Sequence, residues 1–150
     1  MKKKLFCMIA VVALLVVTSV CLLACGEEEA KNYADGTYQG RSNDFLGDSG
    51  GVASGYGEVT ITIKDNVIVE CDFKLYELDG TLKDATYGQG LSDANRRKAQ
   101  VAAQSAPRYA AAIVKEGSLK GVDSLSGATY SYREFVEAVR DALKKAEIKD

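Results

Sequence analysis

The residues best suited to chemistry lie in one short run, Asp123 to Thr129 (DSLSGAT), directly before an expected helix. Gly127 permits a backbone conformation closed to other residues, and Ala128 adds no bulk. Thr129 and Ser131 would present hydroxyl groups at the start of that helix. Free backbone N–H groups and the positive end of the helix dipole favour an anion such as phosphate. The run therefore suits a phosphate held beside a hydroxyl.

The same run also has a purely structural interpretation. Ser131 and Glu134 have the S-x-x-E spacing of a capping box, in which a side chain accepts a hydrogen bond from the helix backbone. A tight glycine turn before such a cap is common. The residues alone leave both interpretations open.

Little other chemistry is available to the chain. It contains no histidine, which excludes a histidine base and histidine metal ligands. Of its four cysteines, Cys7 and Cys21 lie in an apolar leader and Cys25 follows it, so Cys71 has no partner for an internal disulfide or a zinc site. Cys71 lies in an alternating apolar pattern, which predicts a small core residue. No metal site is expected, and a bound group would have to supply any chemistry.

Residues 1–24 have the layout of a secretory leader, with a basic start at Lys2–Lys4 and an apolar stretch behind it. With Cys25 at the cut, this layout resembles the lipobox of bacterial lipoproteins. The resemblance implies cleavage before Cys25 and acylation of that cysteine as a membrane lipid anchor. An uncleaved membrane-spanning anchor is the alternative. Either form places the remaining chain on the extracytoplasmic face of the cell membrane.

Residues 25–34 are expected to be a charged linker that includes the lipidated Cys25, and residues 35–147 one folded domain. A domain of this length buries one ordinary core. The whole chain has a net charge of −2, and loss of Lys2–Lys4 with the leader makes the mature chain more acidic. This acidity argues against nucleic acid as a partner.

Alternating apolar residues predict a β-hairpin. Glu58–Lys64 and Val67–Leu75 both alternate, and Asp65–Asn66 between them tolerates the positive φ of a tight turn. Asp35–Gly40 is expected to lead into a further strand. Because only one face of the hairpin is apolar, the sheet should be covered on one side only.

The second half of the chain is predicted to be mainly helical. An Ala-rich helix begins at Asp93 and ends at Glu116–Gly117. Because proline is tolerated only in the first turn of a helix, Pro107 should cause a kink near Ser105 or begin a second helix there.

Residues 119–125 are expected to be extended, and a last amphipathic helix is expected from about Tyr132 to Lys145. The predicted fold class is α+β, a small antiparallel sheet with helices packed on one face, forming a single domain after the signal peptide.

The spacing Asp123-x-x-Ser126-Gly127-Ala128-Thr129 resembles the flavinylation motif of the FMN-binding domain family. This family includes the flavin subunits of the sodium-pumping NADH:quinone oxidoreductase and of the Rnf complex, and lipoproteins of extracellular electron transfer. The resemblance extends from Asp35 to the last helix. It implies that FMN is joined through its phosphate to Thr129. It further implies that a flavin transferase makes this bond from FAD with a magnesium ion, recognising mainly the other motif residues, Asp123, Ser126, Gly127 and Ala128.

The chain departs from many relatives at two places. Relatives often have Thr-Ser one residue after the flavinylated threonine, whereas here Ser131 keeps the first hydroxyl and Tyr132 takes the second place, as in a lipoprotein-like subgroup. Relatives often carry Pro-Gly-x-Gly near the flavin, and here only Tyr87-Gly-Gln-Gly90 is found. Tyr87 is expected either to stack on the isoalloxazine ring or to lie on the surface.

The resemblance implies a membrane-anchored, extracytoplasmic electron-transfer protein with covalently attached FMN. Its partners would be the flavin transferase, a membrane electron donor such as a quinone-linked dehydrogenase, and an acceptor. Three alternatives stay open. They are a flavin reductase-type enzyme module, a non-catalytic surface lipoprotein whose Ser-Gly-Ala-Thr run is only a helix cap, and a domain that binds FMN without a covalent bond.

Overall fold

The computed structural model describes residues 31–47 and 54–149. The chain divides into two units, residues 1–31 and 32–150, and the second unit contains every strand and helix reported below. The predicted leader and Cys25 lie outside the described residues. Within those residues, no helix combines the length and the apolar character needed to cross a membrane.

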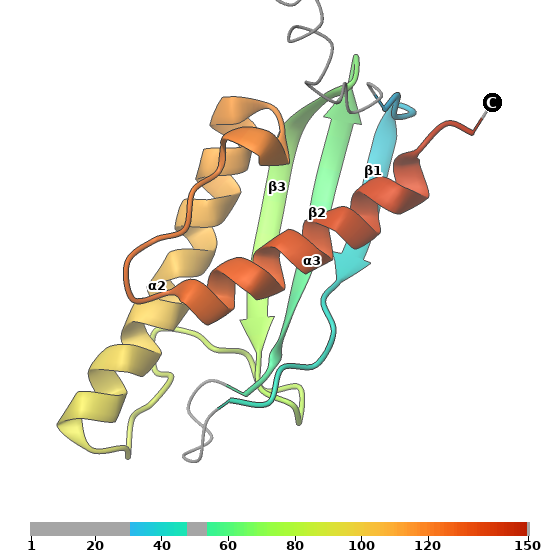
Figure 1. The fold of residues 1–150 in the computed structure, drawn as a ribbon. Helices are drawn as coiled ribbons and strands as arrows, with labels where there is room; N and C mark the ends of the chain where they lie inside the picture. The colour runs from blue at the N-terminus through green and yellow to red at the C-terminus, as the bar shows by residue number, and fades with distance from the viewer. Residues whose placement is uncertain (1–30, 48–53, 150) are drawn as a thin grey trace, which may run out of the picture. The chain divides into compact units, whose positions relative to one another are not determined.

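Three antiparallel strands form one sheet in the order β1-β2-β3 (Figure 1). They are β1 (Gly36–Arg41), β2 (Tyr56–Lys64) and β3 (Val67–Tyr76). The strands β2 and β3 are the predicted hairpin, because Asp65 and Asn66 join them with φ values of 51° and 64°. Two successive residues in the left-handed region match the right-handed twist of the strands. The hairpin prediction is therefore confirmed.

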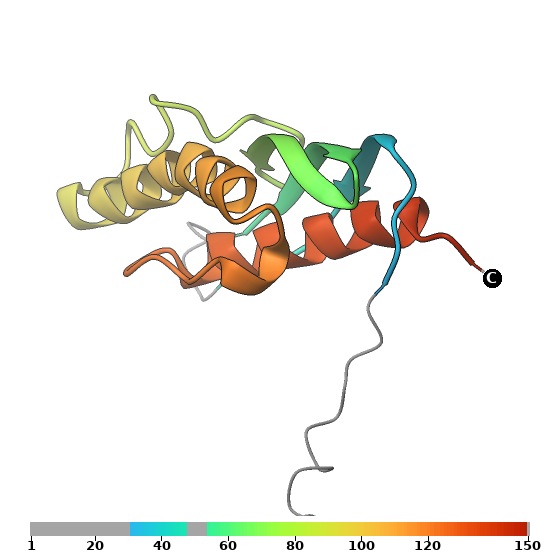
Figure 2. The same ribbon diagram turned by 90° about the horizontal axis from the view of Figure 1, so that it is seen from above.

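Both long helices, α2 (Asp93–Glu116) and α3 (Thr129–Ala146), pack on the same face of the sheet. In Figure 1, α3 crosses β1 and β2 while α2 lies beside β3, and Figure 2 shows α3 beneath the sheet when it is seen from above. The apolar residues of the strands and helices meet in one core: Val59, Ile61, Ile63, Ile68, Phe73, Leu75, Ala106, Tyr109, Ile113, Phe135, Ala138, Val139 and Ala142. The predicted α+β class is confirmed.

The helix α2 is a single helix of 24 residues with Pro107 inside it, so of the two alternatives for this region the second helix is wrong. Pro107 lies on the exposed face of α2, where its ring does not disturb the core. Its missing N–H removes one helical hydrogen bond, and packing of α2 against β3 outweighs this loss. The helix ends as predicted, with Gly117 in the left-handed region at a φ of 69°.

Two predictions about the region before the last helix are wrong. Residues 119–125 are not simply extended, because Leu119–Gly121 form a short 3₁₀ helix, η1. The helix α3 begins at Thr129 and not near Tyr132. The Tyr132 N–H donates to the Ala128 carbonyl over 2.9 Å, which closes the first helical turn three residues earlier than expected. The capping-box spacing of Ser131 and Glu134 placed the start too late, because Ala128 occupies the cap position.

Candidate functional site

The Ser-Gly-Ala-Thr run forms a tight turn between η1 and α3. The Ala128 N–H donates to the Leu125 carbonyl over 3.0 Å, and Gly127 has a φ of +77°. A Cβ on Gly127 would also lie 3.4 Å from Val101 Cγ1 of α2. Residue 127 thus needs a conformation that side chains disfavour, although a Cβ there would make only ordinary van der Waals contact with Val101. The motif glycine is explained by the geometry of this turn.

Two tyrosine hydroxyls hold the turn in place. The buried Tyr109 Oη accepts a hydrogen bond from the Leu125 N–H over 2.9 Å and donates to the Ala128 carbonyl over 3.3 Å. Tyr132 Oη donates to the Val122 carbonyl over 2.8 Å. Helix α2 therefore supplies a side chain that fixes the backbone within the run, and α3 supplies one that fixes the residue directly before it.

Sequence reasoning missed both positioning residues. The only available signal was a tyrosine at a core position of the Ala-rich helix α2, because a buried phenol hydroxyl usually needs a partner. That signal indicates a hydrogen bond but does not identify the backbone groups that make it.

The structure brings the predicted motif residues together, with different exposure. Asp123, Ser126, Gly127 and Thr129 are exposed, whereas Ala128 is only 3% exposed and packs on the core. Thr129 is the first residue of α3, so its position is accessible at the positive end of the helix dipole.

Ser131 does not join this exposed group. Ser131 is the third residue of α3 and is only 3% exposed, so the expectation that it presents an accessible hydroxyl at the helix start is wrong. The capping-box interpretation is also wrong. Ala128 occupies the cap position, no side chain makes a capping hydrogen bond there, and Glu134 lies inside the helix. The turn therefore does not serve as a side-chain cap.

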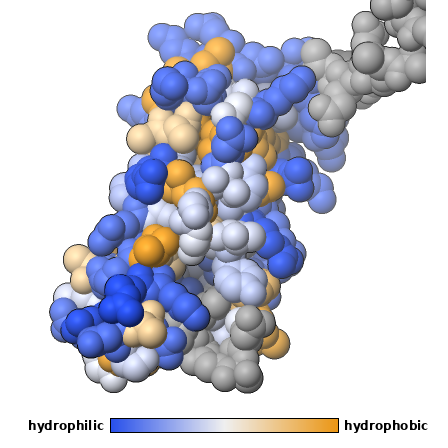
Figure 3. All heavy atoms as spheres, turned by 60° about the vertical axis from the view of Figure 1, so that its left-hand side comes forward, coloured by the Kyte–Doolittle hydropathy of each residue, from blue (hydrophilic) through white to orange (hydrophobic). Residues whose placement is uncertain are grey.

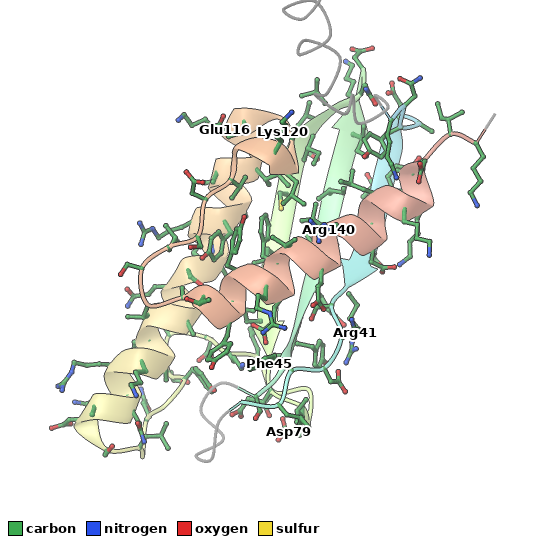
Figure 4. The ribbon with its side chains drawn as sticks, viewed as in Figure 1. Arg41, Phe45, Asp79, Glu116, Lys120 and Arg140 are labelled. Carbon is green, nitrogen blue, oxygen red and sulfur yellow. The ribbon has the colours of Figure 1, made fainter. Side chains whose placement is uncertain are left out.

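The charge around the helix start suits an anion. The first turn of α3 contains no acidic residue, although acidic side chains stabilise this position in most helices. One turn further along, the Arg133 guanidinium lies over the Phe45 ring, 5.2 Å from its centroid, and the Phe45 and Tyr130 rings are 4.5 Å apart. Figure 4 shows Phe45 close to the start of α3. An exposed hydroxyl, a bare helix N-terminus and a nearby arginine fit a bound phosphate group.

Tyr87 is not a surface residue, so that alternative is wrong. Its side chain is 9% exposed, and its carbonyl accepts a hydrogen bond from Gln100 Nε2 over 2.6 Å. Burial raises the pKa of the Tyr87 hydroxyl to about 12. Stacking of Tyr87 on a flavin ring stays a prediction.

An open groove of about 620 Å³ lies between β3 and α2, and Figure 3 shows this side of the molecule. Cys71 lines the groove half-buried, and burial raises the pKa of its thiol to about 12. The thiol is therefore protonated at neutral pH and poorly nucleophilic. The groove shares no residue with the Ser-Gly-Ala-Thr turn. In residues 31–47 and 54–149, no cluster of three or more potential ligands could hold a metal ion.

Comparisons with known proteins agree with the motif. The family profile for the FMN-binding domain matches residues 54–144, which include the whole Ser-Gly-Ala-Thr turn and most of α3. A crystal structure of the CPE2226 protein from Clostridium perfringens is similar with a TM-score of 0.56 and 21% identity. That similarity covers 77% of this chain and 89% of the other, and it concerns the fold alone. A search of curated proteins gave no match.

Proposed function

Because the chain belongs to the FMN-binding domain family, we propose that it carries FMN as a phosphoester on Thr129 and transfers electrons at the extracytoplasmic face of a membrane. FMN is the cofactor of this family, and when bound it supplies one- and two-electron redox chemistry. The protein's own contribution is to attach, orient and surround that group.

The observation that carries the covalent attachment is the position of Thr129. Its side chain is exposed on the first residue of α3, behind a turn fixed by Gly127 and Tyr109. The backbone N–H groups of the first helical turn have no partner within the helix, so they stabilise the negative charge of a phosphoester. Arg133 adds a positive charge one turn away.

Maturation needs a flavin transferase that recognises the motif. Asp123, Ser126 and Gly127 are exposed and accessible to such an enzyme, whereas Ala128 is buried and contributes through the shape of the turn. Ser131 is buried within the fold, so its hydroxyl is not accessible to the transferase.

The N-terminal sequence supports membrane attachment as part of this proposal. In this proposal residues 1–24 are removed, Cys25 is acylated, and residues 25–34 link the lipid to a domain of residues 35–147. Two or more acyl chains are needed for stable anchoring. An anchored carrier with an accessible flavin can exchange electrons with a membrane donor, such as a quinone-linked dehydrogenase, and with an acceptor outside the membrane.

One expression experiment tests the attachment and the anchor separately. The full chain is expressed with a flavin transferase in cells fed a labelled fatty acid, and denatured protein is examined on a gel for flavin fluorescence and for lipid label. Wild type should carry both. Thr129→Ala should lose fluorescence and keep the lipid label, whereas Cys25→Ser should lose the label. Ser124→Ala removes an exposed hydroxyl of the same run outside the motif spacing, and it should keep both signals.

Wild-type protein without covalent flavin would overturn the attachment. A label that persists in Cys25→Ser would overturn the anchor. Electron transfer is tested with the purified flavoprotein, which should pass its electrons once per flavin to a soluble oxidant. Saturating steady-state turnover of that oxidant would indicate a reductase instead.

A further inference from the structure

Two oppositely charged side chains are buried together at the end of the sheet where β2 begins and β3 ends. Glu134 of α3 is 3% exposed, and Lys83, in the segment after β3, is 6% exposed. Each influences the pKa of the other, yet no ion pair within 4.0 Å joins them among the described residues. Burial of two charges without direct contact is costly, because each loses its water.

The carboxyl of Glu134 is also incompletely bonded. Its Oε1 is buried and has no hydrogen-bond partner among the described residues. Burial raises the pKa of Glu134 to about 7, against the attraction of Lys83, and the nearby charge of Glu137 raises it further. A pKa in this range lets Glu134 change its protonation state close to neutral pH.

Two glycines make room for these side chains. A Cβ on Gly55 would lie 2.6 Å from Lys83 Nζ, and a Cβ on Gly57 would lie 3.2 Å from Glu134 Cβ. Lys83 Nζ also lies 5.5 Å from the centroid of the Tyr87 ring. Gly57 lies in β2 and Gly55 directly before it, so neither position places a side chain against the two charged groups.

The titratable groups that act on this cluster come from two elements. Glu77, Lys83 and Tyr87 belong to the segment that follows β3, and Glu134 and Glu137 belong to α3. Three of these five groups are carboxyl groups, and Lys83 is the positively charged one. Among them, Lys83 therefore is the group that lowers the pKa of Glu134.

A continuous series of contacts joins the cluster to the proposed attachment residue. The Gly55 backbone pairs with that of Phe45 through hydrogen bonds of 2.7 and 2.9 Å. The Phe45 ring packs against Tyr130, which is the residue next to Thr129 in α3. Part of the path between a charge held at Thr129 and Glu134 thus runs through these packed groups, where electrostatic interactions are stronger than in water.

We propose that Glu134 is a proton-binding site coupled to the charge on the flavin, an inference that rests on the proposed function. When a reductant such as dithionite delivers electrons to the protein-bound FMN, the Glu134 carboxylate binds one proton from water and forms one O–H bond. Reoxidation by an added acceptor breaks that bond and returns the proton. Lys83 favours the carboxylate and so sets the pH at which the proton leaves.

The first test needs no flavin. In the full-length Thr129→Ala protein with ¹³C-carboxyl-labelled glutamate, the Glu134 resonance should titrate near pH 7. Lys83→Met should move that midpoint to higher pH. A carboxyl that stays ionised from pH 5 to 9 would overturn the inference and leave the flavinylation proposal untouched.

The second test uses the flavinylated wild type. Infrared difference spectra between the reduced and oxidised forms at pH 7 should contain the C=O band of a protonated carboxyl, absent in Glu134→Gln. The matched control Asp141→Asn changes a carboxylate of the same helix whose pKa is lowered by its hydrogen bond with Lys145, and it should keep the band.

If reduction raises the pKa of Glu134 by one, the equilibrium constant for reduction changes up to about tenfold. This change corresponds to about 30 mV in the potential of a two-electron couple. Glu134→Gln should remove this part of the pH dependence of the potential. Identical Glu134 titrations in the oxidised and reduced wild type would overturn the coupling even if every variant failed to fold. Absence of covalent flavin in the wild type would instead count against the proposed function.

Discussion

At the scale of single residues, one phenol group does most to shape the candidate site. Tyr109 reaches from α2 to the turn before α3 and bonds to a backbone N–H and a backbone carbonyl. Its ring packs against Phe135, with centroids 5.2 Å apart, so the hydroxyl is positioned by the core itself. The position of Thr129 thus depends on a side chain from another helix, α2.

We predict that Tyr109→Phe destabilises the domain by about 1–3 kcal/mol, because the Leu125 N–H and the Ala128 carbonyl lose a buried partner. The ring and its packing are retained. Tyr132→Phe, which removes one bond from a half-buried hydroxyl, should cost less. Urea denaturation of both variants measures the difference. Equal stability of Tyr109→Phe and wild type would show that the turn does not depend on these bonds.

At the scale of elements, β1 and α3 approach each other so closely that residue 40 has no room for a side chain. A Cβ on Gly40 would lie 2.0 Å from the Ala138 carbonyl oxygen and 2.6 Å from the Ala142 N–H nitrogen. Both obstacles are helix backbone, which cannot rotate away as a side chain can. The absence of a side chain at residue 40, together with the alanines at 138 and 142, lets α3 lie directly on the strand.

Gly40→Ala should therefore force β1 and α3 apart and cost about 1–3 kcal/mol or more, as overpacked cores do. The neighbouring exposed residue offers a control, since Gln39→Ala changes β1 without meeting the helix. Thermal unfolding of the two variants gives the comparison. A Gly40→Ala protein as stable as Gln39→Ala would contradict the close packing of these two elements.

The elements that could be predicted are those specified by local pattern. Residues 56–76 alternate about Asp65–Asn66, and both the strand period and the turn act within a few residues of one another. The uninterrupted helix through Pro107 could not be predicted, because contacts of α2 with β3 offset the local cost of proline. The start of α3 was misplaced because Ser131 and Glu134 have capping-box spacing, whereas Ala128 occupies the cap position and packs in the core.

The residues of the candidate site also fall into those that the sequence could predict and those that it could not. The turn at Gly127 and the exposure of Thr129 could be anticipated from a short motif. Tyr109, Lys83 and Glu134 could not, because they lie far from the motif or on the hidden side of α3, and only the fold brings them together. Spacing along the chain reports neighbours in sequence and carries little information about neighbours across the core.

At the scale of the whole molecule, the buried cluster makes stability depend on pH. The folded-state pKa of Glu134 is about 7, above its ordinary value of 4.5, so the folded protein binds more protons than the unfolded chain between these values. Stability from the protonated carboxyl is complete below pH 4.5 and is lost as the pH rises through 7. Burial lowers the pKa of Lys83 from its ordinary value of 10.5. In the alkaline range below 10.5 the folded protein therefore binds fewer protons at Lys83 than the unfolded chain, so this group makes the stability rise with pH.

The flavin-free domain should therefore lose up to about 3 kcal/mol of unfolding free energy between pH 5 and pH 8. Any loss of the Lys83 proton within this range acts in the opposite direction and makes the decrease smaller. Glu134→Gln should flatten this loss, because a neutral amide binds no proton in either state. Asp141→Asn should keep it, since the pKa of Asp141 is lowered and this carboxylate stays ionised throughout that range. Urea unfolding of the three proteins at both pH values measures the effect. A wild-type stability that rises from pH 5 to pH 8 would mean that the Glu134 carboxylate is stabilised in the fold, and the cluster would then be a permanent ion pair.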